Sequence, residues 1–380
     1  MGCAAAFWLS RLSQGRLSIC VAEPDPGHAF SSTALSVASI RQQFATEINV
    51  KISAYSIEFL RNIETYLGPQ GKLDSVDVRE NGYLLLSGTP DGATSLRAAQ
   101  KMQRRLGAQT DLLTPDALAQ RFPWLSVGDV TLASFGAVGE GWFDNMALLQ
   151  GLRRAARHQG VNFLADRVIG LRGTGRRVHV ARLAKGGNMT VGNFINAAGT
   201  GASDLMRHLG EEIPVEPRKR TVFVIDAPNA RHPDAPLLVC HSGFYLRPEN
   251  THWLCASVPV EDGPCDARDF EPDLDAFERD IWPRLYARVP GFHAVKVLSE
   301  WAGHYAYNRL DQNGIVGAHP NWRNLYLMNG FSGYGLQQAP AVGRGIAELL
   351  LSGSYQTLDM SDLSVARVLE GKAFRENNII

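Results

Sequence analysis

The sequence predicts an α/β fold, α+β overall, in which a Rossmann-like nucleotide-binding domain carries a second domain built mainly on an antiparallel sheet. Three apolar strands are each accompanied by a glycine turn and a helix, which is typical of a parallel sheet that binds a nucleotide at the carboxyl ends of its strands. Residues 218–260 instead show a pattern of alternating short strands that are rich in Val, Phe, Tyr and Trp. This pattern favours an antiparallel sheet. A chain of 380 residues is long enough for both domains.

The first thirty residues contain a helix, a tight turn, a buried strand and a terminal acid. Residues 3–12 are small and helix-forming, residues 17–22 form a short apolar strand, and Glu23 follows it. In a dinucleotide-binding βαβ unit the acid lies roughly 20 residues beyond the glycine motif, and Gly2 precedes Glu23 by 21 residues. The pattern therefore predicts the second half of such a unit, and an ordinary Ala-rich helix followed by a strand remains the alternative.

The middle of the chain is expected to alternate helices with strands until a second glycine turn. Asp144 can cap the helix that follows it, because its carboxylate would accept hydrogen bonds from free backbone N–H groups. The turn at 197–202 directly follows an apolar strand and leads into a helix. We expect helices at 44–66, 96–106 and 145–158, strands at 83–88, 160–163 and 191–196, and a hairpin at 168–183.

The last third of the chain contains a third unit of strand, glycine turn and helix. Apolar residues at helical spacing predict a helix over 273–289. The strand 325–328 runs into the glycine-rich turn 330–335, and a helix over 339–351 is closed by Gly353. Helix N-termini at such turns offer N–H groups and a favourable dipole to phosphate oxygens.

Composition excludes several classes of protein. Lys and Arg together number 38 and balance 38 Asp and Glu, so we expect no nucleic-acid partner, which would normally meet a basic face. Five cysteines without CxxC spacing or nearby histidine partners predict no metal site. We also expect no transmembrane segment, because no apolar run approaches the roughly 18–20 residues that cross a bilayer.

Two glycine turns carry a family resemblance that extends over almost the whole chain. Residues 198–202 (AGTGA) and 330–340 (GFSGYGLQQAP) resemble the FAD-dependent D-amino-acid oxidase and sarcosine oxidase superfamily. Residues 36–44 and 305–317 look like its branch called FAD-dependent oxidoreductase domain-containing protein 1, which includes a mitochondrial complex I assembly factor and bacterial relatives. In the superfamily the first strand carries the first two fingerprint glycines, so this chain is expected to start at the third, Gly2.

The resemblance implies how the adenosine half of FAD is held. Gly2 would approach the pyrophosphate, and Glu23 would hold the adenosine ribose. Val168 would face the adenine through its backbone, while Ala198 and Gly199 would pass beneath the cofactor. A chain that lacks the superfamily's first strand is expected to bind FAD poorly.

The same resemblance implies the contacts of the flavin ring. Backbone N–H groups at the third glycine turn would meet the N1/O2 side of reduced flavin, where negative charge develops when hydride reaches N5. The residues expected at this edge are Gly333, Tyr334, Gly335, Leu336 and Gln337, and those expected on the flavin side of the loop after the ribose-binding acid are Ser32, Ala34 and Ser36.

Five further residues are expected at the substrate as catalytic or binding residues. Arg41 falls where sarcosine oxidases place a carboxylate-binding arginine, since a guanidinium fork matches a carboxylate, and a surface or flavin-packing arginine is the alternative. Tyr245 and Arg247 lie on one face of a strand that should face the flavin, where they would bind an anion unless Arg247 pairs with a nearby acid. His304 and Tyr305 would line the pocket, unless they serve only in packing.

Two positions depart from the sarcosine oxidases. Gly303 stands where the covalent flavoproteins of that group have a cysteine, so FAD is expected to be bound non-covalently. Gln337 stands where those enzymes have a lysine implicated in oxygen activation. A dehydrogenase with an unknown electron acceptor is therefore expected rather than an oxidase.

The resemblance implies an FAD-dependent oxidoreductase that oxidises a carboxylate-bearing amine, either an N-substituted glycine or an amino acid, to an imine by hydride transfer to flavin N5. Positioning by Arg41 and an aromatic pocket would provide most of the protein's contribution. The alternative is a flavin-containing assembly or interaction factor related to complex I assembly, in which FAD is structural. A truncated chain without full function is a third possibility.

We expect the FAD-binding domain to be discontinuous, over 1–75, 135–212 and 312–380, with the substrate domain over 76–134 and 213–311. We expect no signal peptide in the first residues, because no basic residue precedes their apolar stretch. The protein is therefore expected to be cytoplasmic, or mitochondrial if its N-terminus continues into a transit peptide.

Overall fold

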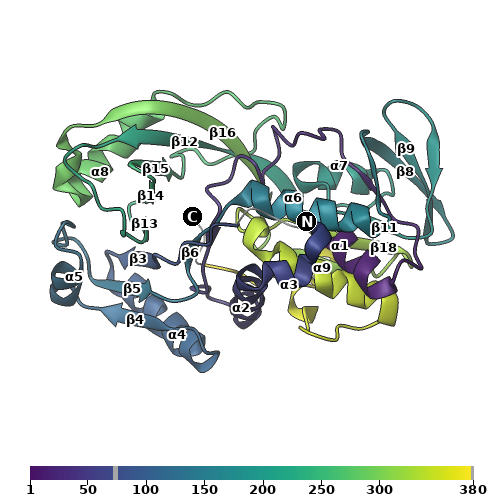
Figure 1. The fold of residues 1–380 in the computed structure, drawn as a ribbon, viewed down its shortest axis with the longest axis horizontal. Helices are drawn as coiled ribbons and strands as arrows, with labels where there is room; N and C mark the ends of the chain where they lie inside the picture. The colour runs from purple at the N-terminus through teal and green to yellow at the C-terminus, as the bar shows by residue number, and fades with distance from the viewer. Residues whose placement is uncertain (72–75, 378–380) are drawn as a thin grey trace.

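The computed structural model describes residues 1–71 and 76–377 and places two unlike halves side by side (Figure 1). One half is built on an eight-stranded mixed sheet, and the other on short sheets covered by long helices, so the predicted α/β class is confirmed. The helices are α1 (Gly2–Ser13), α2 (Glu47–Arg61), α3 (Ile63–Leu67), α4 (Pro90–Arg105), α5 (Pro115–Arg121), α6 (Asn145–His158), α7 (Ala202–Arg207), α8 (Trp282–Arg288), α9 (Gly335–Ser352) and α10 (Val365–Leu369).

In the large sheet all neighbouring strands are antiparallel except β13 and β3. Its strands in spatial order are β16 (Lys296–Asn308), β12 (Val215–Asp226), β15 (His252–Ser257), β14 (Phe244–Glu249), β13 (Leu237–Val239), β3 (Tyr83–Ser87), β5 (Leu132–Gly136) and β4 (Thr110–Leu113). The antiparallel sheet predicted for residues 218–260 is therefore confirmed.

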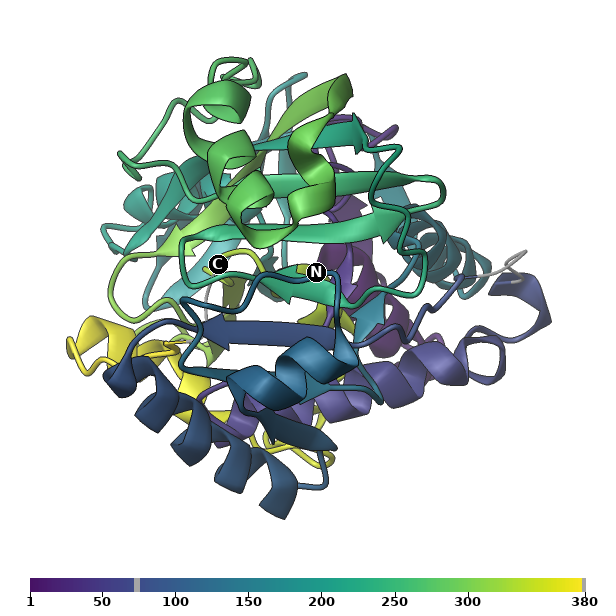
Figure 2. The same cartoon turned by 90° about the vertical axis from the view of Figure 1, so that its left-hand side faces the viewer.

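Alternation along β14 separates the two faces of the large sheet. Phe244 and Leu246 point into an outer core that α5 and α8 cover (Figure 2). Tyr245 points to the inner face, where it packs with Tyr83 and Val222. Phe244 and Tyr245 thus lie in different cores, which confirms their expected opposite orientation. The reason is that successive side chains of a strand point to opposite faces. The inner face is the one turned toward the nucleotide-binding half.

The nucleotide-binding half contains short sheets rather than one continuous ladder. β1 (Cys20–Ala22) pairs in parallel with β7 (Asn162–Leu164), and β11 (Phe194–Asn196) pairs in parallel with β18 (Leu325–Asn329). Within the described residues β1 and β11 belong to different sheets. The other strands are β17 (Ile315–Ala318) beside β18, the meander β8 (Val168–Thr174), β9 (Arg177–Leu183) and β10 (Asn188–Thr190), and the pair β2 (Ser39–Ile40) and β6 (Gly141–Trp142).

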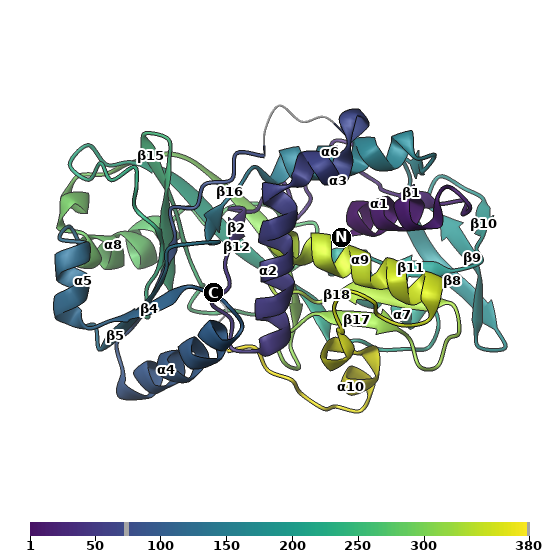
Figure 3. The ribbon, with the colours of Figure 1, turned by 60° about the horizontal axis from the view of Figure 1, so that its bottom comes forward.

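Close packing of α1 against α9 fixes the position of the first helix (Figure 3). A Cβ on Gly343 would lie 2.7 Å from the carbonyl carbon of Ala4, so the two backbones approach too closely for any larger residue at position 343. Trp8 adds a hydrogen bond from its Nε1 to the carbonyl oxygen of Pro340, at 2.9 Å. These contacts hold the N-terminus of α1 beside β1 and β11.

Two long helices expected from periodicity are interrupted in the structure. The helix expected over 44–66 is divided at Asn62 into α2 and α3, where the backbone leaves the helical region with a φ of −113° and a ψ of 24°. The helix expected over 273–289 opens as a π-helical turn at Phe277–Ile281, and a proline just after it cannot donate the next regular bond.

Residues that cap or end a helix were predicted more accurately than the lengths of these two helices. Asp144 caps α6 as predicted, and its Oδ1 accepts a hydrogen bond from the backbone N of Ala147 at 2.8 Å. Gly353 ends α9 with a φ of 76°, which favours glycine. The domain boundaries stay a prediction, and the one after residue 75 falls at residues 72–75, outside the described part of the chain.

Candidate active site

A cavity of about 1700 Å³ lies between the two halves of the molecule. The first turn of α1 and the end of β1 line one end of it, and the inner face of the large sheet lines the other. Pockets for a single small molecule usually measure about 300–1,000 Å³. This cavity is therefore large enough for a dinucleotide and a substrate together.

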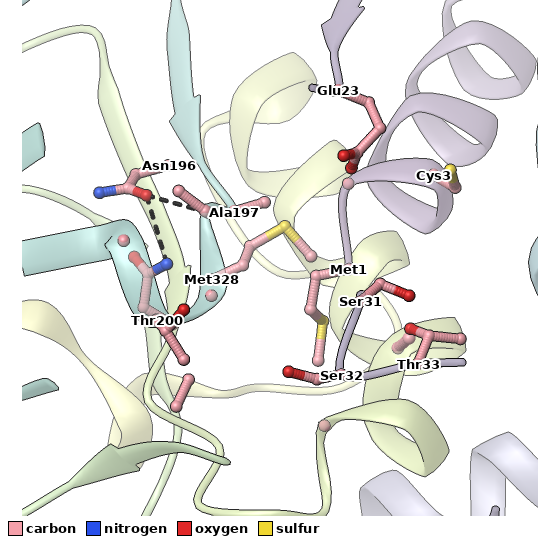
Figure 4. A pocket seen from close by; sticks show the side chains of 18 of the residues that line it. Met1, Cys3, Glu23, Ser31, Ser32, Thr33, Asn196, Ala197, Thr200 and Met328 are labelled. Carbon is pink, nitrogen blue, oxygen red and sulfur yellow. Dashed lines mark hydrogen bonds between the residues drawn. The ribbon is translucent and has the colours of Figure 1, made fainter. Parts of the chain in front are cut away.

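Glu23 marks the first end of the cavity, at the carboxyl end of β1 (Figure 4). Its backbone N donates to the carbonyl oxygen of Leu164 at 2.9 Å, and its Oε1 accepts from the backbone N of Asp25 at 3.0 Å. His28 is buried with its Nδ1 3.8 Å from Glu23 Oε2, and burial lowers the pKa of this imidazole. Because a neutral His28 does not form an ion pair with Glu23, the carboxylate remains suited to accept hydrogen bonds from ribose hydroxyls.

The first turn of α1 lies at the same end of the cavity, which Met1, Gly2 and Cys3 line. The first N–H groups of a helix have no partner inside the helix, and the helix dipole adds to their attraction for phosphate. A Cβ on Gly2 would meet its nearest atoms at 3.9 Å, which is ordinary contact. The position of Gly2 fits a phosphate contact, although its surroundings alone do not require glycine.

Asn196 organises the second glycine turn, across the cavity from Glu23 (Figure 4). Its Oδ1 accepts from the backbone N of Ala198 at 3.2 Å, and its Nδ2 donates to the carbonyl oxygen of Ala202 at 3.1 Å. Gly199 has a φ of 55°, so the turn uses the left-handed region that glycine favours. Ala198 and Gly199 line the cavity as expected, and Asn196 is a turn-forming residue that the sequence reading missed.

The third glycine turn closes over the opposite end of the cavity. Gly333 has a φ of 101°, and a Cβ there would lie 2.5 Å from the ring of Tyr305. Only glycine therefore allows Tyr305 to pack on this turn. The backbone continues through Gly335 into the first turn of α9, where Gly335, Leu336 and Gln337 line the cavity. The first N–H groups of a helix have no partner within the helix. These donors suit the negative edge of a reduced flavin.

Arg41 is 3% exposed and yet lines the cavity. Its Nη1 donates to the carbonyl oxygen of Gln43 at 2.9 Å, and its guanidinium carbon lies 4.3 Å from the ring centre of Phe44. The backbone N of Arg41 donates to Oε1 of Gln337 at 2.9 Å, which joins it to the third glycine turn. Arg41 is thus a buried, oriented cation beside the place expected for the flavin.

Glu140 lies behind Arg41 and outside the cavity lining. Burial raises the pKa of this carboxyl to about 7, although hydrogen bonds from Gln43 and Gln42 and the charge of Arg41 oppose the shift. Glu140 Oε2 accepts from Gln43 Nε2 at 2.7 Å, and Oε1 accepts from the backbone N of Gln42 at 2.8 Å. Glu140 therefore fixes the backbone that carries Arg41.

Three tyrosines from different strands meet in the substrate end of the cavity: Tyr83 on β3, Tyr245 on β14 and Tyr305 on β16. Burial raises the pKa of Tyr83 to about 12 and that of Tyr245 well above its usual value. The neighbouring Tyr305 raises the pKa of Tyr245 further. All of this favours neutral hydroxyl groups, which can donate hydrogen bonds to an anionic substrate.

Arg220 on β12 is another arginine that lines the cavity, and the sequence reading missed it. It is 4% exposed, its guanidinium lies 4.9 Å from the ring centre of Tyr305, and it pairs with Asp262. One sequence feature could have indicated Arg220: it belongs to the run Arg218-Lys219-Arg220, and in a strand Arg218 and Arg220 point to one face while Lys219 points to the other. Only the strand order, with β12 next to β16, brings Arg220 to Tyr305.

His304 lies at the rim of the cavity rather than among the tyrosines. Its Nε2 lies 2.7 Å from the carbonyl oxygen of Asp269, and its ring centre lies 4.4 Å from that of Phe270. Burial lowers the pKa of His304. Its carbonyl oxygen accepts a hydrogen bond from Ser32 Oγ at 2.7 Å, so it connects the large sheet to the loop after β1.

Two expected site residues lie outside the cavity lining. The backbone of Ala34 turns away, with its N donating to Ser31 Oγ at 3.1 Å. Arg247 shares a sheet face with Tyr245, but its Nε donates to the carbonyl oxygen of Val37 at 3.1 Å and its guanidinium lies over Trp142. The other expected residues do line it: Gly2, Glu23, Ser32, Ser36, Arg41, Val168, Ala198, Gly199, Tyr245, His304, Tyr305, Gly333, Tyr334, Gly335, Leu336 and Gln337.

Gly303, the position of the covalent cysteine in related enzymes, faces the cavity without a side chain. A Cβ there would lie 2.9 Å from the Cβ of Leu35, so a larger residue would require movement of the loop. Over residues 1–71 and 76–377, no cluster of three or more His, Cys, Asp or Glu side chains could hold a metal ion. Nor does any helix in the described chain have the length and apolar character needed to span a membrane.

Known proteins resemble this chain over most of its length. The family model described as FAD dependent oxidoreductase matches residues 1–349. FAD-dependent oxidoreductase domain-containing protein 1 of Bos taurus is 39% identical over 415 residues, covering 100% of this chain and 85% of the relative. The solved structure of L-proline dehydrogenase from P. horikoshii superimposes with a TM-score of 0.85 at 24% identity, covering 98% of this chain and 96% of that one. Glycine oxidase from Geobacillus kaustophilus gives 0.80 at 20% identity, covering 96% and 95%.

Proposed function

Because the chain belongs to the family of FAD-dependent oxidoreductases, with FAD as its cofactor, we propose that it oxidises a carboxylate-bearing amine, an N-substituted glycine or an amino acid, to the imine. When bound, FAD supplies the acceptor of the hydride that leaves the substrate carbon. The observation that carries the proposal is Arg41, a buried guanidinium that lines the cavity and is joined to the third glycine turn through Gln337.

The chain's own residues would bind and orient the substrate. Arg41 would hold the carboxylate through its guanidinium fork. Tyr83 and Tyr245, kept neutral by burial, would donate hydrogen bonds and cover the substrate. The apolar side chains of Val222 and Leu237 line the same end of the cavity and would exclude water from the reacting carbon.

The N–H groups at the start of α9 would stabilise the charge that develops on the flavin side of the reaction. Gln337 would add no positive charge for oxygen activation, and its Oε1 accepts from the backbone of Arg41. We therefore propose a dehydrogenase whose electron acceptor is a molecule other than oxygen. The neighbours named L-proline dehydrogenase and glycine oxidase support an amino acid or related amine as substrate.

Anaerobic reduction of the bound flavin by a panel of N-methylated glycines and amino acids tests this proposal. Arg41→Met should lower kcat/KM for the active amine by an amount that corresponds to about 2–4 kcal/mol of transition-state stabilisation. The FAD content of this variant should hardly change. Arg247→Met is the matched control, because Arg247 is also buried over an aromatic ring but does not line the cavity. Loss of FAD from the Arg41 variant with unchanged substrate preference would make Arg41 a cofactor-binding residue.

A panel in which no amine reduces a fully bound flavin would contradict the proposal. That result would favour the alternative predicted from the resemblance, a flavin-containing assembly or interaction factor in which FAD is structural.

A further inference from the structure

Arg220 has hydrogen-bonding capacity that the described structure leaves unused. It stands on β12 directly opposite Gly303 of β16, lines the cavity and is 4% exposed. Its Nε is buried and has no hydrogen-bond acceptor in the described part of the chain. A buried guanidinium N–H without an acceptor is costly, so a ligand that offers an oxygen here would be favoured.

A carboxylate already occupies the other edge of this guanidinium. Asp262 Oδ1 lies 2.7 Å from Arg220 Nη1, and Oδ2 lies 3.0 Å from Nη2, which is a bidentate pair. Asp262 comes from the irregular segment 258–276 between β15 and the π-helical turn. The guanidinium of Arg220 in the cavity is therefore paired with a carboxylate of the protein itself.

If a ligand displaced Asp262 from Arg220, Asp262 would still be paired with a second arginine, Arg218. Asp262 Oδ2 also accepts from Arg218 Nη1 at 3.0 Å, and Arg218 does not line the cavity. Removing one partner of a buried ion pair is expensive mainly because the other charge is left alone. Here the incoming carboxylate would compensate Arg220 while Arg218 compensates Asp262, so neither charge would be left unpaired.

Arg41 and Arg220 stand on different elements. Arg41 follows β2 and is tied to α9, whereas Arg220 belongs to the large sheet and stacks on Tyr305. The hydroxyl groups of Tyr83 and Tyr245, whose pKa values are raised by burial, lie in the same part of the cavity. This part of the cavity thus offers two guanidinium groups and several hydroxyl donors.

We infer that Arg220 is a second carboxylate anchor, that Asp262 occupies it until substrate arrives, and that the substrates are amines carrying two acidic groups. This inference rests on the proposed function, since it takes Arg41 as the anchor of the first carboxylate. The acidic group remote from the amine exchanges with Asp262 on Arg220. Binding of a diacid therefore also releases one attachment of the segment 258–276.

Valerate and glutarate test the inference, because they have the same number of carbons and neither has an amine to oxidise. Their dissociation constants for the FAD-loaded protein are measured from the flavin absorbance and from the shift in melting temperature. We expect glutarate to bind about tenfold more tightly than valerate to the unaltered protein. Arg220→Met should remove this preference and leave valerate binding unchanged. Asp262→Asn should strengthen glutarate binding about tenfold, because the competing carboxylate is gone.

Lys219→Met is the matched control. Lys219 neighbours Arg220 and pairs with Asp269 of the same segment, at 2.7 Å, but it does not line the cavity. This variant loosens the segment without touching Arg220, so the preference for glutarate should persist.

Three results would overturn the inference. Equal affinities of valerate and glutarate in the unaltered protein would remove the second anchor and leave the carboxylate-amine proposal intact. Weaker glutarate binding in Asp262→Asn would show that Asp262 supports the site rather than competes for it. If neither acid bound, the first carboxylate anchor of the proposed function would fail along with the second.

Discussion

The large sheet and the nucleotide-binding half are stabilised in different ways. β12 and β16 share a ladder along the whole of β12, whereas β1 pairs with β7 only from Cys20 to Ala22. β1 and β11 are not joined in one described sheet, and helix packing holds them in place. Residues of the large sheet are therefore positioned by strand register, while those around the nucleotide end depend on turns, helix ends and side-chain hydrogen bonds.

Asp311 lies just after β16 of the large sheet, one residue before the predicted start of the nucleotide-binding segment 312–380, and its buried network extends to Arg367 of α10. This network gives the largest expected difference between the halves. Asp311 is fully buried and accepts from Arg367 Nε at 3.0 Å and from Asn308 Nδ2 at 2.7 Å. Asp311→Ala would leave the buried Arg367 without its carboxylate, and we expect a loss of about 3–5 kcal/mol in the free energy of unfolding. Urea unfolding monitored by circular dichroism measures it.

An exposed pair in the large sheet provides the control. Asp226 and Arg231 form an ion pair whose side chains are 32% and 42% exposed. Asp226→Ala should therefore cost no more than about 1 kcal/mol. Equal losses for Asp226→Ala and Asp311→Ala would refute the view that the nucleotide-binding half depends more on its buried side-chain network.

The junction between the halves should show a pH dependence that comes from Glu140. Its pKa is about 7 in the folded protein and near 4.5 for an ordinary glutamate, so the folded state binds this proton more tightly than the unfolded state. Stability should therefore fall by about 3 kcal/mol as the pH rises from below 4.5 to above 7. The midpoint of urea unfolding, measured at several pH values across this range, should decrease with pH in the unaltered protein. In Glu140→Gln the midpoint should no longer show this decrease. An unchanged slope in the variant would assign the pH dependence to other groups.

Removal of FAD should affect the halves unequally. Non-covalent FAD should be released intact by acid, in agreement with Gly303, and yellow colour that stays with the washed precipitate would contradict this. Restoring FAD at 100 times its dissociation constant should add about 2.7 kcal/mol of stability. In hydrogen exchange, amides of β1 and β11 should gain more protection than those of β14 and β15, and uniform protection would argue against two differently stabilised halves.

Helix caps should show the smallest effect, and it should be the same in both halves. Asp144 caps α6 beside the nucleotide end, and Thr114 caps α5 on the large sheet by accepting from the backbone N of Ala117 at 3.3 Å. Replacing either with Ala should cost about 1 kcal/mol, because a cap satisfies local N–H groups. Melting temperatures of the two variants measure it, and a much larger loss at one cap would mean that the cap also supports long-range packing.

The parts predicted most accurately from the sequence depend on neighbouring residues. The cap at Asp144, the left-handed glycine at Gly353 and the opposite orientations of Phe244 and Tyr245 follow from local geometry. The helix break at Asn62 was not predicted, because the apolar periodicity continues on both sides of it.

The site was only partly predictable. Arg41 and Tyr245 line the cavity as expected, while Arg247, two residues from Tyr245 on the same face, packs against Trp142 outside it. Alternation gives the face of a strand, but it does not say how far along the strand a cavity extends. Arg220 was missed because nothing in its own segment indicates that it faces Tyr305.

The sequence by itself determined the class of fold, the glycine turns and the family resemblance, and that resemblance implies FAD as cofactor and Arg41 as a site residue. Only the tertiary structure decided that Arg220 enters the cavity, that Asp262 occupies it, and that Glu140 is buried behind Arg41. The physical reason is that turns and caps are satisfied within a few residues of chain. Contacts between β12 and β16, or between Glu140 and Gln43, depend instead on strand order and register, which bring together residues far apart in the sequence.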